Sequence, residues 1–286
     1  MSQPYLIVGA DGLLGGSLRR HWRETGRSVA CTSLLPVPDP EGVLHFDLSQ
    51  PTESWPPLPP GRAAVLCAAI TSLDQCRRDP EATRFINVTQ TLALARQLVE
   101  NGAFVVFISS NLVFDGTKPC RGAAELTCPQ TEYGRQKADA ESGLAQFGQR
   151  VAVVRLTKVF HPALLMVRGW IDALRGGTPI HPFSDFVCSP IALPAVTRAL
   201  ATIAESEQSS IWQFSGSADV SYADLATHIA DRFDCDPALV QPRRGRGAGH
   251  LEHLPQHTTL DATRAQQHLG FDVCEPKRVT DTTFFP

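Results

Sequence analysis

Short apolar segments alternate with amphipathic helical segments through the first half of this 286-residue chain, and this alternation restricts its folds more than any other feature. The segments with the character of buried strands are residues 5–9, 28–32, 43–47, 63–69, 104–109 and 151–156. Helical spacing is found at residues 13–24, 80–101 and 131–147. Strands and helices that alternate in this way form βαβ units, whose parallel strands are covered by helices on both faces. The sequence therefore predicts an α/β fold built on a doubly wound, Rossmann-type parallel sheet.

The alternation changes after about residue 157, which indicates a second structural unit. The later segments are helix-like at residues 164–174, 194–205, 222–233 and 261–269, with one short strand near residues 211–214. We expect residues 1–157 to form the Rossmann-type domain and residues 158–286 to form mainly a smaller C-terminal cap. Elements at about residues 185–215 are able to return to the first domain, so we expect a soft boundary.

Composition and charge exclude several classes of partner. The net charge of −3 is too small to favour nucleic acid or an anionic membrane as the main partner. No apolar run reaches the roughly 20 residues that cross a bilayer, and the first residues lead directly into a strand, which leaves no room for a signal peptide. The eight cysteines are scattered without a Cys-x-x-Cys pair, as in a reduced cytoplasmic protein without a disulfide framework or a metal site. These features predict a cytoplasmic protein whose partner is a small molecule.

The first strand runs into Gly9-x-x-Gly12-x-x-Gly15 at the start of a helix. Glycines at this spacing permit a tight turn, let the backbone approach a pyrophosphate and let the helix pack closely, while the helix N-terminus faces the negative charge. The strand and helix on either side favour this interpretation over a purely structural turn. We therefore expect a dinucleotide cofactor on this turn, contacted by Gly9, Asp11, Gly12, Leu13, Leu14 and Gly15.

The end of the second strand bears on which dinucleotide binds. Sites that prefer NAD usually place an acid there, which binds the ribose diol. Here the strand ends in Thr32 and Ser33, whose hydroxyls tolerate a 2′-phosphate, and Arg19 and Arg20 are candidates to bind that phosphate. The sequence therefore favours NADP(H) over NAD(H).

The third strand ends at Asp47, which is followed by Leu48. An acid at this position is able to accept a hydrogen bond from the amino group of the adenine. It serves equally well to cap the turn into the proline-rich loop at residues 50–61. The sequence leaves both roles open.

A Tyr-x-x-x-Lys pair, Tyr133 and Lys137, lies near the start of a helical segment, 23 residues after Ser110. Positions i and i+4 share one face of a helix, so the phenol and the ammonium can point at one site. A phenol has a reference pKa of about 10, and a nearby ammonium lowers that pKa towards the neutral range. Ser110, at the end of an apolar strand, is then able to hydrogen-bond the oxygen of a substrate carbonyl or alcohol. This set predicts proton transfer while a nicotinamide cofactor moves a hydride.

Together these segments resemble the extended short-chain dehydrogenase/reductase family, and within it the dTDP-4-dehydrorhamnose reductase group. The resemblance rests on Gly9-Ala-Asp-Gly-Leu-Leu-Gly15, Ala68-Ala-Ile-Thr71, Asn87, Ile108-Ser-Ser-Asn-Leu-Val-Phe-Asp-Gly116, Tyr133-Gly-Arg-Gln-Lys137, Val154-Arg155 and Thr258-Thr-Leu-Asp261. It covers nearly the full length of the chain. It implies an NAD(P)-binding Rossmann domain over residues 1–157, a substrate-binding cap within residues 158–286, a nucleotide sugar as substrate and a homodimer.

The resemblance also implies roles for individual residues. Tyr133 is expected to act as the general acid for the reduced carbonyl, and Lys137 to bind the nicotinamide ribose and lower the pKa of the tyrosine. Ser110 occupies the position that polarises the carbonyl. The residues implied to line or support the cofactor site are Ala68, Ala69, Thr71 and Asn87.

The chain departs from the family where Asn111 and Leu112 follow Ser110, in place of the family's Asp and Tyr. Three functions therefore stay open. The first is an NAD(P)H-dependent reductase of a keto group on a nucleotide-linked sugar. The second is a catalytically silent, cofactor-binding regulatory subunit, since the regulatory β subunit of methionine adenosyltransferase resembles the same group. The third is a sugar-nucleotide epimerase or dehydratase, which shares the Tyr-Lys pair and retains its NAD.

Two polar clusters in the cap lie outside this pattern. The densest basic run consists of Arg243, Arg244 and Arg246. These arginines either bind a substrate diphosphate or belong to a solvated surface loop. Three histidines follow closely, at His250, His253 and His257. Glycines and a proline in the same stretch argue against a helix that would gather them, so we expect no metal.

Overall fold

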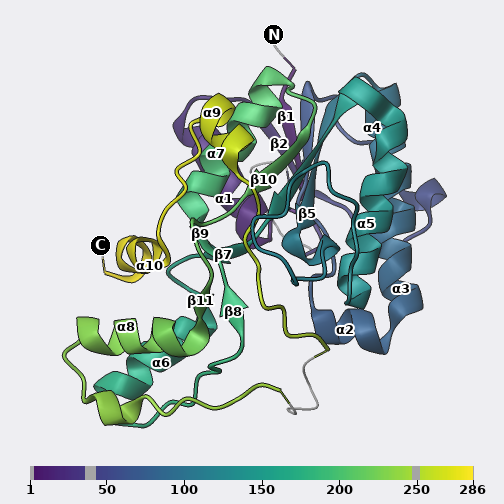
Figure 1. The fold of residues 1–286 in the computed structure, drawn as a ribbon. Helices are drawn as coiled ribbons and strands as arrows, with labels where there is room; N and C mark the ends of the chain where they lie inside the picture. The colour runs from purple at the N-terminus through teal and green to yellow at the C-terminus, as the bar shows by residue number, and fades with distance from the viewer. Residues whose placement is uncertain (1–2, 36–42, 247–251, 286) are drawn as a thin grey trace.

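The computed structural model describes residues 3–35, 43–246 and 252–285, and it confirms the predicted Rossmann-type α/β fold (Figure 1). Seven parallel strands form one sheet in the order β10-β6-β5-β4-β1-β2-β3. The strands are β1 Tyr5–Val8, β2 Val29–Ser33, β3 Val43–His45, β4 Ala63–Leu66, β5 Phe104–Ser110, β6 Val151–Leu156 and β10 Ile211–Phe214. The central strands are almost fully buried apolar runs, as expected where helices cover both faces of a parallel sheet.

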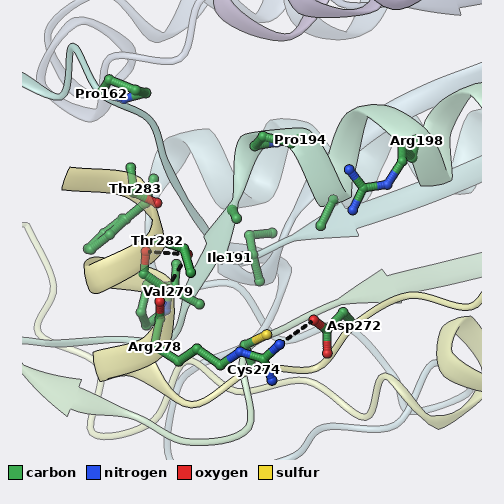
Figure 2. Close-up of a pocket in the computed structure, with 14 residues that line it drawn as sticks. Pro162, Ile191, Pro194, Arg198, Asp272, Cys274, Arg278, Val279, Thr282 and Thr283 are labelled. Carbon is green, nitrogen blue, oxygen red and sulfur yellow. Dashed lines mark hydrogen bonds and ion pairs between the residues drawn. The ribbon is translucent and has the colours of Figure 1, made fainter. Parts of the chain in front are cut away.

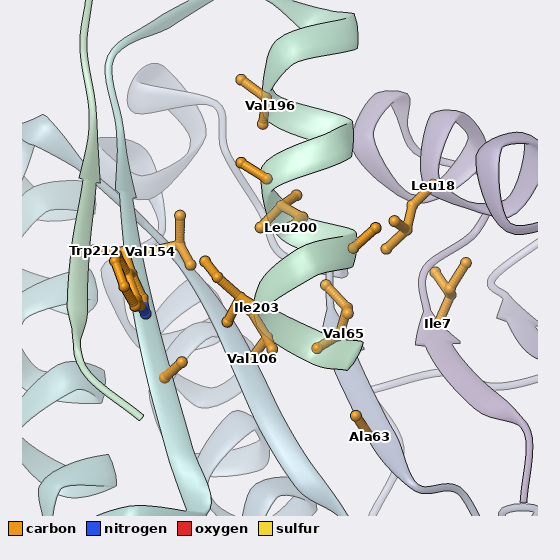
Figure 3. Packing of buried hydrophobic residues seen from close by; sticks show 14 of the residues in the cluster. Ile7, Leu18, Ala63, Val65, Val106, Val154, Val196, Leu200, Ile203 and Trp212 are labelled. Carbon is orange, nitrogen blue, oxygen red and sulfur yellow. The ribbon is translucent and has the colours of Figure 1, made fainter. Parts of the chain in front are cut away.

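Helices pack on both faces of the sheet (Figure 1). One face carries α1 Leu13–Glu24, α7 Leu193–Ser206 and α9 Thr263–Leu269, and the other carries α4 Thr91–Glu100 and α5 Glu132–Leu144. Figure 3 shows Leu18 of α1 and Leu200 of α7 packed against Ile7 and Val106 of the strands. Burying one such side chain is worth about 1.5–3 kcal/mol. The core of the first domain therefore includes α7, although α7 comes from the second half of the chain.

The helical stretch predicted at residues 80–101 changes its winding near the middle. It consists of α3 Pro80–Arg84, a π-helical turn Phe85–Gln90 and α4. Turns of the π type are rare and often lie at functional sites. A further helix that was not predicted, α2 Leu73–Arg78, precedes this stretch. The helix predicted at residues 131–147 is shorter than expected, because α5 passes at Ala145 into a 3-10 helical segment Ala145–Arg150.

The cap has its own apolar core below the sheet in Figure 1. Its helices are α6 Leu165–Arg175, α8 Tyr222–Arg232 and α10 Pro276–Phe284. Two small sheets complete it: β7 Lys158–Phe160 pairs in parallel with β9 Pro190–Ala192, and β8 Val187–Cys188 pairs antiparallel with β11 Val220–Ser221. The remaining short 3-10 helices are Thr52–Ser54, Asn111–Val113 and Pro237–Leu239.

The chain passes between the sheet and the cap several times. After β6 it enters the cap, and α7 and β10 then return to the first domain, where β10 pairs with β6 as an edge strand of the main sheet. The neighbouring strands β8 and β9 pair within the cap. Near the end of the chain, α9 packs on the sheet and α10 packs against the cap core. These crossings hold the cap at the carboxyl ends of β5 and β6.

Candidate active site

The carboxyl ends of β1 and β4 form a crevice, because the chain leaves these neighbouring strands towards opposite faces of the sheet. A cleft of about 510 Å³ lies there. Seven of the predicted cofactor residues line it: Gly9, Asp11, Gly12, Asp47, Leu48, Ala68 and Ala69. The sequence analysis assigned no role to the other residues of its wall, which are Leu34, Phe46, Ser49, Cys67, Ile70, Gln75 and Ile86.

The glycine turn meets the steric demands of a site for a dinucleotide. Gly9 has a φ of +88°, and a Cβ added to it would lie 2.8 Å from the backbone nitrogen of Ala68. A Cβ on Gly15 would collide with the carbonyl oxygen of Gly9, so α1 packs directly on the turn. Within the described residues, no side chain caps the N-terminus of α1 at Gly12. The first N–H groups of the helix can therefore donate hydrogen bonds to a pyrophosphate, and the turn fits that group.

Nine of the predicted cofactor residues do not line this cleft, and Leu13, Leu14 and Thr71 are three of them. Leu13 is 43% exposed on the first turn of α1, and Leu14 packs partly against the sheet core. Thr71 is exposed on the loop after β4. Their contact with a cofactor stays a prediction.

Thr32 and Ser33 use their hydroxyls within the protein. The Thr32 Oγ1 accepts a hydrogen bond from Gly9 N at 3.2 Å, and the Thr32 carbonyl accepts one from Ala10 N at 2.8 Å. The Ser33 Oγ accepts a hydrogen bond from Leu35 N at 3.0 Å and donates one to the Leu35 carbonyl at 3.2 Å. Both side chains are buried. Their visible role is to hold the glycine turn and the exit of β2.

Asp47 caps a turn and also lines the cleft. It accepts hydrogen bonds from Ser49 N at 2.8 Å and from Gln50 Nε2 at 3.3 Å. Burial raises the pKa of Asp47, but these hydrogen bonds outweigh burial and hold the pKa below its usual value. The carboxylate therefore carries its charge at the edge of the cleft.

The turn that carries Ser110 packs directly on the first turn of α5. The Ser110 Oγ accepts a hydrogen bond from Leu112 N at 3.1 Å, which closes this turn. The Thr131 Oγ1 caps α5 by accepting a hydrogen bond from Gly134 N at 3.0 Å. A Cβ on Gly134 would collide with the carbonyl oxygen of Leu112. The glycine next to Tyr133 therefore lets strand β5 and helix α5 meet at the site.

Lys137 reaches from α5 back to strand β5. Its Nζ donates a hydrogen bond to the carbonyl of Ile108 at 2.8 Å and lies 4.6 Å from the centroid of the Phe107 ring. The centroid of the Tyr133 ring is 5.7 Å from the same Nζ. Burial lowers the pKa of Lys137 to about 8, which leaves most of the side chain charged at neutral pH.

The lowering of the Tyr133 pKa that we expected from Lys137 is not found. Burial, with a smaller contribution from the neighbouring Cys76, raises the pKa of Tyr133 above its ordinary value. The ammonium of Lys137 is hydrogen-bonded to a backbone carbonyl, and its effect on the phenol does not offset burial. The phenol therefore keeps its proton at neutral pH, which is the form that a proton donor needs.

Asn87, in the π-helical turn, ties the loop after β4 to α5. Its Oδ1 accepts a hydrogen bond from Ile70 N at 2.8 Å, and its Nδ2 donates one to the Ile70 carbonyl at 2.9 Å. The same Nδ2 donates to Gln136 Oε1 on α5 at 2.8 Å. The amide is thus fully engaged between the wall of the cleft and the helix that carries Tyr133.

A buried ion pair supports the site from behind. Arg155 of β6 and Glu141 of α5 approach to 2.6 Å, and Ser109, the neighbour of Ser110, donates a hydrogen bond to Glu141 Oε1. Arg155 also donates to Gln213 Oε1 of β10 at 3.3 Å. The network joins three strands to α5. The sequence signal from which it could have been predicted is an arginine within an otherwise apolar strand.

A second cleft, of about 220 Å³, lies between the carboxyl end of the sheet and the cap. Ser110 lines it together with Asn111 and Leu112, the two positions where the chain departs from the family pattern. The other lining residues are Leu73, Thr131, Leu156, Thr157, Lys158, Phe186, Val187, Cys188, Tyr222, His253, Pro255 and Thr258. The sequence analysis missed the roles of the cap residues, because they come together only in the folded chain.

A larger pocket of about 340 Å³ lies apart from these residues, between α7 and α10 (Figure 2). Ile191 and Val279 form part of its apolar floor, and Arg278 forms an ion pair with Asp272 at 3.6 Å. None of the predicted catalytic or cofactor residues lines it. Of the three predicted catalytic residues, Ser110 lines the second cleft, whereas Tyr133 and Lys137 line neither of the two clefts at the carboxyl end of the sheet.

Comparison with known protein families gives a match over nearly the whole chain. The family model described as the RmlD substrate binding domain matches residues 3–282. The chain belongs to this family. The match covers both the sheet domain and the cap, and it confirms the resemblance to dTDP-4-dehydrorhamnose reductases expected from the sequence.

Relatives of this RmlD-domain chain have different functions. Methionine adenosyltransferase 2 subunit beta of Rattus norvegicus is 25% identical over 289 residues, which cover 97% of this chain and 86% of the relative. A probable low-salt glycan biosynthesis reductase, Agl14 of Haloferax volcanii, is 24% identical over 274 residues, which cover 92% of this chain and 91% of the relative.

Solved structures share the fold over nearly the whole length. A dTDP-4-dehydrorhamnose reductase of Bacillus anthracis in complex with NADP has a TM-score of 0.84 at 17% identity, with 99% of each chain covered. MoeE5 in complex with UDP-glucose and NAD has a TM-score of 0.78 at 22% identity, with 98% of this chain and 97% of that chain covered.

The remaining polar clusters of the RmlD-domain chain lie outside both clefts, apart from His253. Arg243 stacks over the ring of Phe183 at 4.7 Å, and the backbone of the arginine-rich segment binds Asp185. His253 binds the carbonyl of Asp115, His257 binds Asp219, and His250 lies outside the described residues. Among the described residues, no three His, Cys, Asp or Glu side chains gather to hold a metal ion. Nor does the described part of the chain contain a helix long and apolar enough to cross a membrane.

The contact at Gly134 predicts a steric effect. In Gly134→Ala, the new methyl group collides with the Leu112 carbonyl, and we expect a loss of about 1–3 kcal/mol in the free energy of unfolding. Gly169→Ala in α6 is the matched control, because a Cβ there meets no atom within 4 Å. That control should be neutral or gain up to about 1 kcal/mol. Urea denaturation measures both variants, and equal stability of the two would contradict the contact.

The buried Lys137 predicts a pH-dependent stability. Folding lowers its pKa from 10.5 to about 8, so between these pH values the unfolded chain holds a proton that the folded chain lacks. The stability of the wild type relative to Lys137→Met should therefore be constant below about pH 8 and rise above it, by at most about 1.4 kcal/mol per pH unit. Denaturation at about pH 7 and about pH 9.5 measures this difference. Lys277→Met, at an exposed lysine, is the control and should show no such change; a flat difference for Lys137→Met would contradict its burial as a charged group.

Proposed function

We propose that this protein is an NAD(P)H-dependent reductase of a keto group on a nucleotide-linked sugar, similar to dTDP-4-dehydrorhamnose reductase. The observation that carries the proposal is the junction of β5 and α5, which brings Ser110, Tyr133 and Lys137 to the carboxyl end of the sheet. The cofactor-sized cleft lies at the same end of the sheet, and Ser110 also lines the cleft under the cap. The complexes of similar folds with NADP, NAD and UDP-glucose support this reading.

The nicotinamide cofactor would be held by the first cleft. The N-terminus of α1 and the glycine turn would bind its pyrophosphate, Asp47 and Leu48 would contact its adenine, and Ala68 and Ala69 would line the cofactor along the wall of the cleft. When bound, the reduced cofactor supplies a hydride. We favour NADP(H), because β2 ends in Thr32 and Ser33 with no acid to bind a ribose diol.

Side chains of the protein donate the proton and stabilise the charge that remains after its transfer. Tyr133 keeps its proton at neutral pH and donates it to the oxygen of the reduced carbonyl. Ser110 hydrogen-bonds the same oxygen and polarises the carbonyl. Lys137 is mostly charged at neutral pH, and it favours the phenolate that remains after the transfer. The apolar surroundings of the pair strengthen these electrostatic effects.

A second candidate is a cofactor-binding regulatory subunit without turnover. It is favoured by Asn111 and Leu112, which line the cleft where the family carries Asp and Tyr, and by the similarity to methionine adenosyltransferase 2 subunit beta. An epimerase or dehydratase is the third candidate. The lack of an acid directly after Ser110 weighs against a dehydratase.

Tyrosine substitutions test the reductase. In Tyr133→Phe, the proton donor is lost and NADPH oxidation with dTDP-4-dehydro-L-rhamnose should fall about a hundredfold or more, with cofactor binding retained. Tyr5→Phe is the control, because Tyr5 stacks on Trp22 in the core of the sheet domain and should keep full turnover. Turnover is followed by the loss of nicotinamide absorbance, and binding by calorimetry. A Tyr133→Phe variant with wild-type turnover would exclude this mechanism.

A further inference from the structure

The cleft under the cap contains two polar side chains that neither the fold nor the proposed proton transfer uses. Thr157 and Lys158 follow directly after β6, and both line this cleft together with Ser110. The backbone N–H of Thr157 donates a hydrogen bond to the Phe214 carbonyl at 3.1 Å, which fixes the chain at this point. Both side chains therefore sit on a rigid strand exit.

The hydroxyl of Thr157 is a buried polar group without a partner. Only 5% of the residue is exposed, and within the described residues its Oγ1 has no hydrogen-bond partner. Buried hydroxyls are nearly always paired, since an unpaired one costs free energy. A group of this kind on the wall of a cleft is expected where a ligand supplies the missing partner.

Lys158, the next residue, is exposed and adds a positive charge to the lining of the same cleft. It is the only lysine or arginine among the described residues that line the cleft, and none of those residues is an acid. In the part of the chain that the structure describes, Lys158 forms no salt bridge. The carboxylate of Asp219 is hydrogen-bonded to Thr258 and His257. The charge of Lys158 is therefore available to a ligand.

The chemistry of the two side chains suits an anion. Lys158 is exposed, so its ammonium is available at the cleft, and Thr157 brings a hydroxyl donor to the same cleft. An ammonium and a hydroxyl donor together match a carboxylate or phosphate oxygen.

We propose that Thr157 and Lys158 form an oxyanion-binding subsite that selects a substrate with a negatively charged group next to the reacting sugar. This inference rests on the proposed function, because it places a nucleotide sugar in the cleft under the cap. The charged group is either a carboxylate on the sugar, as in a sugar acid, or a phosphate of the nucleotide diphosphate. Both present the same chemistry to the subsite.

Binding measurements separate the two sources of charge. Calorimetry is performed with UDP-glucuronic acid, UDP-glucose and dTDP-glucose, on the wild type and on Lys158→Met, with NADP⁺ present. If Lys158 binds the sugar carboxylate, Lys158→Met lowers the affinity for UDP-glucuronic acid about tenfold or more. The affinities for UDP-glucose and dTDP-glucose, whose sugars are neutral, stay unchanged. If it binds the diphosphate, all three weaken by a similar factor. Lys277→Met, at an exposed lysine on α10, is the charge-matched control.

Thr157→Val distinguishes a ligand-binding hydroxyl from a structural one. Valine keeps the shape and removes the unpaired group, so the variant should unfold at the same or a higher denaturant concentration than the wild type. The affinity for the anionic ligand should nevertheless fall about threefold or more. A structural role would instead reduce stability.

Two results would overturn the inference. If Lys158→Met binds all three nucleotide sugars with unchanged affinity, the proposed oxyanion subsite is contradicted, while the reductase proposal is unaffected. Failure of the wild type to bind any of the three would contradict the nucleotide-sugar function itself, and this inference with it.

Discussion

The junction between strand β5 and helix α5 is the constraint on which the site depends. The carbonyl of Leu112 lies so close to α5 that only glycine fits at position 134, and Lys137 hydrogen-bonds the carbonyl of Ile108 on the strand. These two contacts fix the position of Tyr133 relative to Ser110. Behind this junction, the Arg155–Glu141 pair joins β6 to the same helix, and Ser109 of β5 donates a hydrogen bond to Glu141. A charged pair in this position costs desolvation, and we infer that it is retained because it fixes the geometry.

Much of the sheet domain could be predicted from the sequence, because its signals are local. A short apolar run forms a buried strand and a glycine turn binds phosphate through backbone geometry, so the strands and the cleft residues from Gly9 to Ala69 follow from neighbouring residues. The cap could not be predicted in the same detail. Its lining residues, such as Phe186 and His253, lie far apart in the sequence and meet only through tertiary packing.

The pKa of Tyr133 also could not be predicted from the sequence. The i, i+4 spacing of Tyr133 and Lys137 predicts proximity, and proximity alone would lower the pKa of the phenol. Burial acts in the opposite direction and is stronger, so the pKa of Tyr133 is raised. The spacing of two residues in the sequence does not show how deeply their side chains are buried. The same limit applies to Thr157, whose unpaired hydroxyl is visible only in the folded chain.

Transfer of a deuterium label tests the central claim most directly. The protein is given dTDP-4-dehydro-L-rhamnose and NADPH that carries deuterium at the transferable position of the nicotinamide, and the product is examined by mass spectrometry and NMR. The reductase account predicts one deuterium on the former keto carbon of the sugar and one NADP⁺ formed for each sugar reduced. A sugar without deuterium, alongside bound and unoxidised cofactor, would contradict it.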